Sequence, residues 1–192
     1  MKYDVLLAGV GGQGVLSLAA CIAAGAMKAG LTVRQSEVHG MAQRGGAVLA
    51  HLRLADRPIY SDLIPRGTAD MILGMDPLES LRYLAYLAPG GVLVTATEPF
   101  VNIPDYPDGG ELLAAIGRLP RHRLVDAAAL ARQAGSARAA NMVLVGAASG
   151  YLPIERGKLE QAIAEMFAGK GEEVAAANLK AFAAGLAQGG RP

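Results

Sequence analysis

Two glycine-rich segments constrain the fold of this chain more than any other feature of its sequence. The first has glycines at positions 9, 11, 12 and 14 and directly follows the apolar run at 5–8. A buried strand that ends in such a loop and continues into a helix presents backbone N–H groups and a helix N-terminus to a phosphate or carboxylate. The second segment, residues 36–46, reads Ser-Glu-Val-His-Gly-Met-Ala-Gln-Arg-Gly-Gly. Together the two segments predict a strand, loop, helix and strand unit with a binding edge.

The first segment alone leaves three interpretations open. Gly9, Gly11 and Gly14 fit the G-x-G-x-x-G spacing of dinucleotide-binding folds. Such folds expect an acidic residue about 20 positions further on, at the end of the second strand. Glu37 is the candidate, but polar residues at 34–36 occupy the expected strand end. A dinucleotide site, a site for another anion and a purely structural turn therefore all remain possible.

The second segment brings together a carboxylate, an imidazole, an amide and a guanidinium, at Glu37, His39, Gln43 and Arg44. A guanidinium can hold a carboxylate or phosphate through two hydrogen bonds, so this segment can bind an anionic substrate. The sequence shows no Ser/His/Asp or Cys/His nucleophilic arrangement, so we predict no catalytic residue on the chain. A solvated or structural role for His39, and a role for Arg44 in fixing the loop, remain as alternatives.

Composition limits the partners of the chain. Its 192 residues are 52% hydrophobic, which is enough for one core, and we expect residues 1–192 to form a single domain. Eighteen basic residues stand against seventeen acidic ones, without a basic block, and only 5% of the residues are aromatic. Nucleic acid is therefore not an expected partner, because both backbone neutralisation and base stacking lack their usual residues.

Metal sites and disulfides are not expected either. Cys21 is the single cysteine, so the chain has neither an internal disulfide nor the four thiolates that usually hold an iron–sulfur cluster. The three histidines, His39, His51 and His122, lack the spacing of metal ligands.

The N-terminal region has to be distinguished from an export signal. Residues 18–21 imitate the lipid-attachment site of a bacterial lipoprotein, but Asp4 offsets Lys2 and several glycines interrupt the apolar stretch. The apolar segment at 14–27 is too short and too rich in Ala and Gly to cross a bilayer. We expect a cytoplasmic protein without a membrane span.

The alternation of strand-like and helical runs predicts an α/β, Rossmann-like fold with a mainly parallel sheet flanked by helices. Strands are expected at 5–8, 32–36, 71–74, 92–97 and 123–126, and helices at 15–28, 78–87, 111–118, 127–133, 158–167 and 172–184. The runs at 47–54 and 59–63 predict an inserted β-hairpin. Asp76 is expected to cap the helix that follows it, and Asn141 to cap a helix that ends near 149 or 152.

Three motifs occur in the order Gly-Val-Gly-Gly-Gln-Gly-Val at 9–15, the segment at 36–46, and Asn-Met-Val-Leu-Val-Gly-Ala at 141–147. In this order they resemble the gamma-type module of the ferredoxin-dependent 2-oxoacid oxidoreductases. The second motif is similar to the indolepyruvate-type branch of that family, and the resemblance extends over nearly the whole chain.

The resemblance implies a subunit of an enzyme that oxidatively decarboxylates aryl pyruvates such as indolepyruvate, forms an acyl-CoA and passes two electrons to ferredoxin. In that family a larger alpha subunit carries thiamine diphosphate and the iron–sulfur clusters, so the chain is expected to hold no cofactor and to be inactive alone. Its expected partners are the alpha subunit, ferredoxin through the complex, coenzyme A and the aryl pyruvate.

The candidates for contact with the substrate anion or the coenzyme A path come from both loops. They are Gly9, Gly11, Gly12, Gln13, Gly14, Glu37, His39, Gln43 and Arg44. The alternative function is a free-standing Rossmann-like protein that binds NAD or FAD. A scaffold whose glycines serve only turns is a third interpretation.

Overall fold

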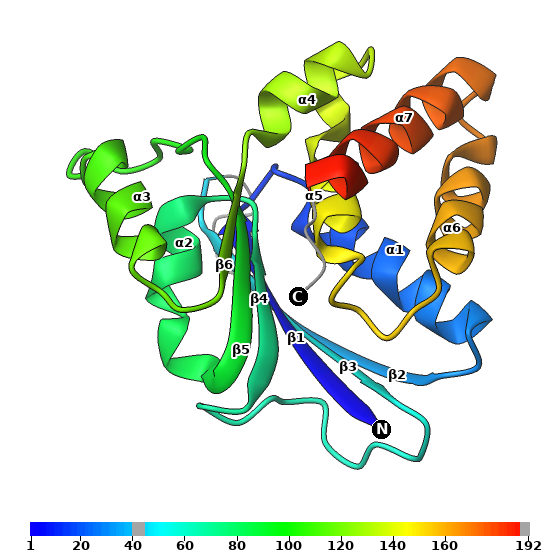
Figure 1. The fold of residues 1–192 in the computed structure, drawn as a ribbon, viewed down its shortest axis with the longest axis horizontal. Coiled ribbons are helices and arrows are strands. Elements are labelled where there is room, and N and C mark those ends of the chain that lie inside the picture. The colour runs from blue at the N-terminus through cyan, green and yellow to red at the C-terminus, as the bar shows by residue number, and fades with distance from the viewer. Residues whose placement is uncertain (40–44, 189–192) are drawn as a thin grey trace.

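The computed structural model of the chain describes residues 1–39 and 45–188, and the side chain of His39 is outside the described set. The described residues form a six-stranded mixed sheet with helices on both faces (Figure 1). The strands are β1 (Lys2–Val10), β2 (Thr32–His39), β3 (Ala47–Ala55), β4 (Ala69–Gly74), β5 (Leu87–Ala96) and β6 (His122–Val125).

The strands lie in the order β2-β3-β1-β4-β5-β6. The pairs β1–β4, β4–β5 and β5–β6 are parallel, whereas β3 runs antiparallel to both β1 and β2. The predicted α/β fold with a mainly parallel sheet is confirmed.

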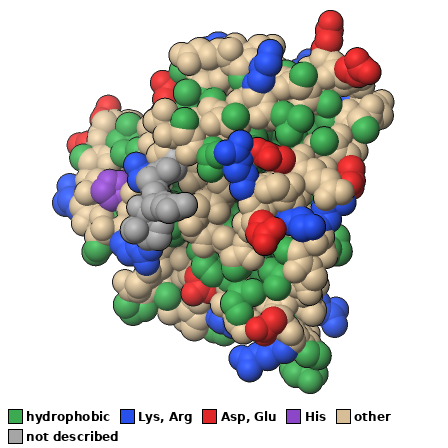
Figure 2. All heavy atoms as spheres, turned by 45° about the vertical axis from the view of Figure 1, so that its right-hand side comes forward, with side chains coloured by type: hydrophobic (Ala, Val, Ile, Leu, Met, Phe, Trp, Pro, Cys, Tyr) green, Lys and Arg blue, Asp and Glu red, His purple; other side chains and the backbone are tan. Residues whose placement is uncertain are grey.

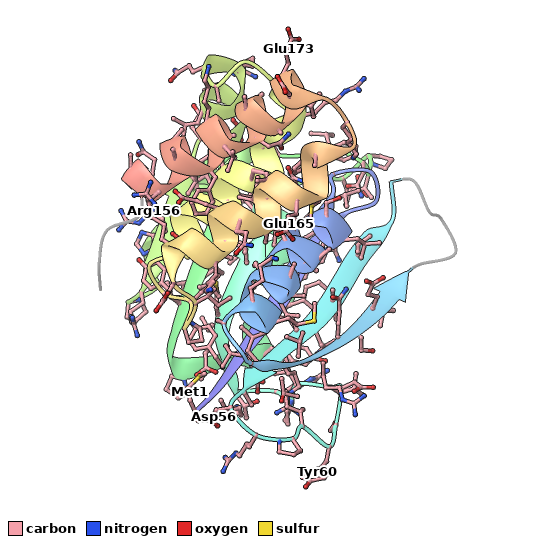
Figure 3. All side chains as sticks on the ribbon, turned by 90° about the vertical axis from the view of Figure 1, so that its right-hand side faces the viewer. Met1, Asp56, Tyr60, Arg156, Glu165 and Glu173 are labelled. Carbon is pink, nitrogen blue, oxygen red and sulfur yellow. The ribbon has the colours of Figure 1, made fainter. Side chains whose placement is uncertain are left out.

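Helices cover the two faces unequally (Figure 1). The helices are α1 (Val15–Lys28), α2 (Pro77–Arg82), α3 (Gly109–Gly117), α4 (Ala127–Gln133), α5 (Ala140–Ala148), α6 (Arg156–Ala168) and α7 (Glu172–Gln188), with short 3-10 helices η1 (Leu84–Tyr86) and η2 (Ala137–Ala139). α1, α5, α6 and α7 lie on one side of the sheet, and α2 and α3 lie on the other. Seen from the first side, α1, α6 and α7 are stacked side by side, and Glu165 of α6 forms an ion pair of 2.7 Å with Lys28 of α1 (Figure 3).

The core follows the alternation of side chains along the strands. Val5 and Leu7 of β1 pack into the larger cluster under α1 and α5, while Leu6 points into a smaller cluster on the opposite face. All three side chains are fully buried. The near-continuous apolar run at 5–8 therefore reflects a central strand that is covered on both faces, as is usual for parallel sheets.

The inserted hairpin exists, but its strands are not the predicted ones. Residues 59–63 form no strand, and β3 instead pairs with β2 through a register that includes Thr32↔Ala55 and His39↔Val48. The reason lies in Arg53, whose guanidinium donates hydrogen bonds of 3.0 Å to the carbonyl oxygens of Ser61 and Leu63. A side chain, and not a backbone ladder, thus holds the segment at 59–63.

Several helix boundaries also differ from the prediction. The helix expected at 78–87 ends at Arg82, and β5 already begins at Leu87, so Pro89 lies inside a strand. The helix expected to have Asn141 as its cap begins two residues earlier, at Ala140, and its cap is Ala139, which makes no side-chain hydrogen bond. Asp76 caps α2 as predicted, because its Oδ1 accepts from the Glu79 amide at 2.9 Å.

The surface drawn in Figure 2 carries positive and negative side chains interspersed with hydrophobic ones. Such a mixture differs from the one-sign stripe that usually binds a phosphate backbone. Within residues 1–39 and 45–188, no helix has the length and apolar character that crossing a bilayer requires.

Candidate functional site

A cleft of about 800 Å³ opens at the carboxyl ends of β1, β4 and β5. The first glycine loop, Met75 and Ala96 form its floor, and residues of α4 to α7 and the turns between them form its walls. The chain leaves β1 toward α1 on one face of the sheet and leaves the adjacent β4 toward α2 on the other face. Ligands of open α/β sheets bind at such a switch point, so this cleft is the candidate functional site.

The loop between β1 and α1 adopts its shape through two glycines with positive φ. Gly12 has a φ of 102° and Gly14 a φ of 87°, a region that residues with a Cβ rarely occupy. Gly14 is the N-cap of α1 and makes no side-chain capping bond. Because the first four amides of a helix lack partners within the helix, the start of α1 can attract an anion.

Gln13 fixes this loop to the sheet. Its Oε1 accepts a 2.8 Å hydrogen bond from the Val10 amide, and its Nε2 donates to the carbonyl oxygen of Met75 at 3.1 Å. Gly9 supports the same arrangement, because a Cβ there would lie 2.7 Å from Val15 Cγ2. Of the predicted loop residues, Gly12, Gln13 and Gly14 line the cleft. Gly9 lies outside the lining and allows the close packing that holds the loop.

The two glycine-rich segments lie against each other. The Gly11 amide donates to the carbonyl oxygen of Gly46 at 2.8 Å, and the Gly45 amide donates to the carbonyl oxygen of Gly11 at 3.2 Å. The second segment therefore begins its return into β3 directly beside the cleft loop. Gln43 and Arg44, which the sequence suggested as ligand contacts, lie outside the described residues.

Glu37 does not occupy the position of a ribose-binding carboxylate. It lies on β2, is exposed, and accepts a hydrogen bond from Gln35. In dinucleotide-binding folds β2 is the direct neighbour of β1, but here β3 separates them. Two strand spacings of about 4.8 Å therefore displace β2 by roughly 10 Å from β1. His39 ends the same strand, so its backbone shares this displacement.

Two cations that the sequence analysis did not select also line the cleft. Arg138 lies in η2 and Lys170 in the turn between α6 and α7, and both are exposed. The ammonium of Lys170 lies 5.2 Å from the centre of the Phe167 ring. These residues are more than a hundred positions from the glycine loop in the sequence. No local sequence signal links these cations to the glycine loop, because only the packing of the helices brings them to the cleft.

Glu98 lines another part of the cleft wall and is hydrogen-bonded to Asp126, which lies outside the cleft lining. Burial raises the pKa of Glu98, and its hydrogen bond with Asp126 raises it further, whereas the same bond lowers the pKa of Asp126. Glu98 Oε1 also accepts from the Ala128 amide at 3.2 Å, and Asp126 Oδ1 caps α4 through the Ala129 amide at 2.9 Å. Glu98 therefore holds its proton to higher pH than an ordinary glutamate, which reduces its repulsion of an anion in the cleft.

Asp76 organises the loop that borders the cleft. Its fully buried carboxylate accepts a 2.8 Å hydrogen bond from the Phe100 amide and another of 2.8 Å from the Tyr106 hydroxyl. At the far side of the loop, Asn102 Nδ2 donates to the carbonyl oxygen of Gly45 at 2.7 Å. The loop at 97–108 is thus tied both to the start of α2 and to the second glycine segment.

The residues that the structure describes do not offer the ligands of a cluster or a metal ion. Burial raises the pKa of the Cys21 thiol to about 12, which opposes its use as a thiolate ligand. In the part of the chain that the structure describes, no three His, Cys, Asp or Glu side chains gather in a metal-binding arrangement.

The sequence matches a known family over almost all of its length. The family model described as pyruvate ferredoxin/flavodoxin oxidoreductase matches residues 4–188. The indolepyruvate oxidoreductase subunit IorB of Archaeoglobus fulgidus is 37% identical, over 100% of this chain and 98% of the relative.

Two solved structures share the fold. The 2-oxoglutarate:ferredoxin oxidoreductase from Magnetococcus marinus, with 2-oxoglutarate, coenzyme A and succinyl-CoA bound, matches with a TM-score of 0.77 at 26% identity. The match covers 97% of this chain but only 31% of that longer chain. The gamma subunit of a keto/oxoacid ferredoxin oxidoreductase from Geobacter sulfurreducens matches with a TM-score of 0.70 at 25% identity, over 97% of both chains.

Proposed function

This chain belongs to the pyruvate ferredoxin/flavodoxin oxidoreductase family, and we propose that it is the non-cluster subunit of an oxidoreductase that converts aryl pyruvates such as indolepyruvate to their acyl-CoA. Membership and full-length similarity make it a subunit of a ferredoxin-dependent 2-oxoacid oxidoreductase. The aryl substrate is the finer part of the proposal. The observation that supports it best is the 37% identity, over the full chain, with a subunit named for indolepyruvate.

The proposed division of labour follows from the residues. With a single buried cysteine, this chain lacks the ligands of an iron–sulfur cluster, so thiamine diphosphate and the clusters are assigned to a larger alpha subunit. Ferredoxin would then receive electrons from that subunit. We assign the complex to the cytoplasm and residues 1–192 to one gamma-type domain.

The cleft is proposed to bind the anionic part of coenzyme A. Gly12 and Gly14 present the start of α1 to the cleft, and Arg138 and Lys170 add two positive charges. Phosphates are stabilised by such a combination of helix N-terminus and cations. Glu37, His39, Gln43 and Arg44 remain proposed contacts for the substrate or the partner, on the segment joined to this loop at Gly11.

Reconstitution tests the function directly. Viologen reduction is measured with indolepyruvate and coenzyme A, using the chain alone, the large subunit alone and both together. Activity is expected only with both subunits, and faster with indolepyruvate than with pyruvate or 2-oxoglutarate. A pure chain that is active by itself, or a complex that prefers pyruvate, would contradict the proposal.

The free-standing NAD or FAD protein is the alternative, and the strand order argues against it. β3 separates Glu37 from the glycine loop, and the loop amide of Gly11 is already bonded to Gly46. Calorimetric titration with NAD, NADP and FAD distinguishes the two functions. Weak or absent binding is expected, whereas micromolar affinity for any of them would favour the alternative.

A further inference from the structure

The loop at 97–108 holds two consecutive apolar side chains out in solvent. Phe100 is 42% exposed and Val101 is 69% exposed. Single exposed apolar residues are common and need no explanation. This pair differs because it stands on a loop whose backbone is fixed at several points. We call residues 100 and 101 the apolar prong.

Three hydrogen bonds hold the prong in place. The Phe100 amide and the Tyr106 hydroxyl both donate to the fully buried Asp76 carboxylate at 2.8 Å, one on each side of Val101 in the sequence. Asn102, the next residue after the prong, donates to the carbonyl oxygen of Gly45 at 2.7 Å. The buried carboxylate of Asp76, at the start of α2, thus fixes the loop at 97–108, which covers little of the core.

Fixing exposed apolar side chains favours association. Binding normally costs the conformational entropy of the loops and side chains that it orders. A loop that is already held by three hydrogen bonds has less of this entropy to lose. Rigid aromatic and aliphatic side chains that enter an apolar pocket of a partner are typical of the residues that dominate binding energy.

The position of the prong indicates the partner. Phe100 also lines the cleft, so a chain that covers the prong would cover part of the candidate ligand site. In the Magnetococcus marinus enzyme, the matched region is 31% of a longer chain, so a similar module there is joined covalently to a larger part of the oxidoreductase. For this chain, we take the larger subunit of the proposed complex as the corresponding occupant.

We propose that the apolar prong, Phe100 and Val101, is a docking element that inserts into an apolar pocket of the large oxidoreductase subunit beside the cleft. This rests on the proposed function, because it takes the large subunit as the partner. Asp76, Tyr106 and Asn102 are positioning residues that hold the prong in its bound conformation.

Association of the two purified subunits tests the prong. The probe is the large subunit from the same organism, identified by its thiamine diphosphate-binding and cluster-cysteine motifs. Val101→Asp is the main variant, since Val101 does not line the cleft and its exposure makes misfolding improbable on physical grounds. Its affinity for the large subunit, measured by calorimetry, is expected to fall about tenfold or more. Val101→Ala should weaken association in the same direction but less.

The matched control is Met27→Asp. Met27 is 61% exposed at the C-terminal end of α1, away from the cleft, so the same charge there should leave the affinity unchanged. Asn102→Ala leaves the prong intact but removes one of its hydrogen bonds, and it should weaken association by a smaller factor. Melting temperatures of the isolated variants should stay close to that of the wild type.

The possible results distinguish a failure of the docking proposal from a failure of the proposed function. If the wild-type chain does not bind the large subunit, the proposed function fails. If the wild type binds and Val101→Asp binds equally well, only the prong inference is overturned. It is also overturned if Val101→Asp keeps its affinity but raises the KM for coenzyme A, which would make the prong a ligand contact. An isolated wild-type dimer that Val101→Asp dissociates would assign the prong to a second copy of this chain and overturn the inference as well.

Discussion

Asn141 lies against Gly14, so that a Cβ added to Gly14 would be 3.1 Å from Asn141 Nδ2. Two sequence motifs that are far apart in the chain therefore meet at the floor of the cleft. Asn141 is not the N-cap of α5, as the sequence suggested, although its Oδ1 accepts a 3.0 Å hydrogen bond from the Met142 amide in the first turn. Asn141 and Gly14 both line the cleft. This contact gives a structural reason for the two motifs to occur together.

Gly14→Ala should destabilise the chain. Gly14 has a φ of 87°, where an L-residue costs about 1–2 kcal/mol, and its Cβ would press on Asn141. Urea unfolding measures the loss. Gly157→Ala in the first turn of α6 is the control, because nothing lies within 4 Å of a Cβ there and Gly157 has no positive φ. A Gly14→Ala variant as stable as the wild type would show that the loop can change its conformation freely.

Gly185→Ala should lower the free energy of unfolding more than Gly14→Ala does, because the added Cβ would push two helices apart. α5 and α7 cross so closely that a Cβ at Gly185 would collide with the backbone carbonyl oxygen of Val143. A backbone atom cannot turn aside as a flexible side chain can, so the helices have to move apart at a cost of about 1–3 kcal/mol or more. Gly117→Ala in α3, which meets open space, is the matched control. Equal urea midpoints for the two variants would contradict the close crossing.

The sequence predicts well those helices whose apolar pattern and end signals all lie within one short stretch of the chain. The bounds of α1 and α4 agree with the prediction, because each helix has a periodic apolar face and a distinct start or stop, such as Gly30 after α1 and Asp126 before α4. The pairing of strands could not be predicted in the same way. β3 could be recognised as a strand, but its insertion between β1 and β2 depends on contacts distant in sequence, and Arg53 captures the segment that looked like its partner.

The candidate site divides in the same way. The glycine loop could be predicted, because positive φ and a helix start leave a local signature at Gly12 and Gly14. Arg138 and Lys170 could not, since an exposed cation in an ordinary turn carries no sign of the cleft that tertiary packing builds around it. The carboxyl pair of Glu98 and Asp126 likewise exists only after β5 and β6 are aligned.

His51 should make the stability of the chain depend on pH. Its Nδ1 accepts a 3.1 Å hydrogen bond from the Ile64 amide, and burial, followed by the nearby Arg53 charge, lowers its pKa, although Asp4 opposes the shift. Below the unfolded pKa of about 6.5 the unfolded chain takes up a proton that the folded chain resists. This contribution is fully present above about pH 6.5 and is lost as the pH falls toward the lower folded pKa.

His51→Asn isolates the effect, because its Oδ1 can accept the same hydrogen bond without titrating. Urea unfolding of both proteins between about pH 7.5 and 5.5 should show a larger loss for the wild type. The carboxylates are common to both proteins, so the difference between the two slopes reports on position 51. Parallel slopes would mean that His51 titrates alike in the folded and unfolded states.

Lys170→Ala and Arg138→Ala test the cleft as a coenzyme A site in the reconstituted complex. Both side chains line the cleft and are exposed, so each ion pair with a phosphate is worth about 0.2–1 kcal/mol, or up to a few-fold in KM. The double variant should raise the KM for coenzyme A by the product of the two factors, provided that the two sites act independently. Melting temperatures should hardly change, as is usual for surface substitutions.

Lys180→Ala is the control for these cations, because Lys180 is an exposed lysine of α7 that does not line the cleft. It should leave the KM for coenzyme A and for the aryl pyruvate unchanged. Raised salt should reduce the difference between the wild type and the double variant, since exposed charges are screened over about 10 Å at 0.1 M salt. If the double variant has an unaltered KM for coenzyme A and a raised KM for the aryl pyruvate, the cleft binds the aryl pyruvate and not coenzyme A.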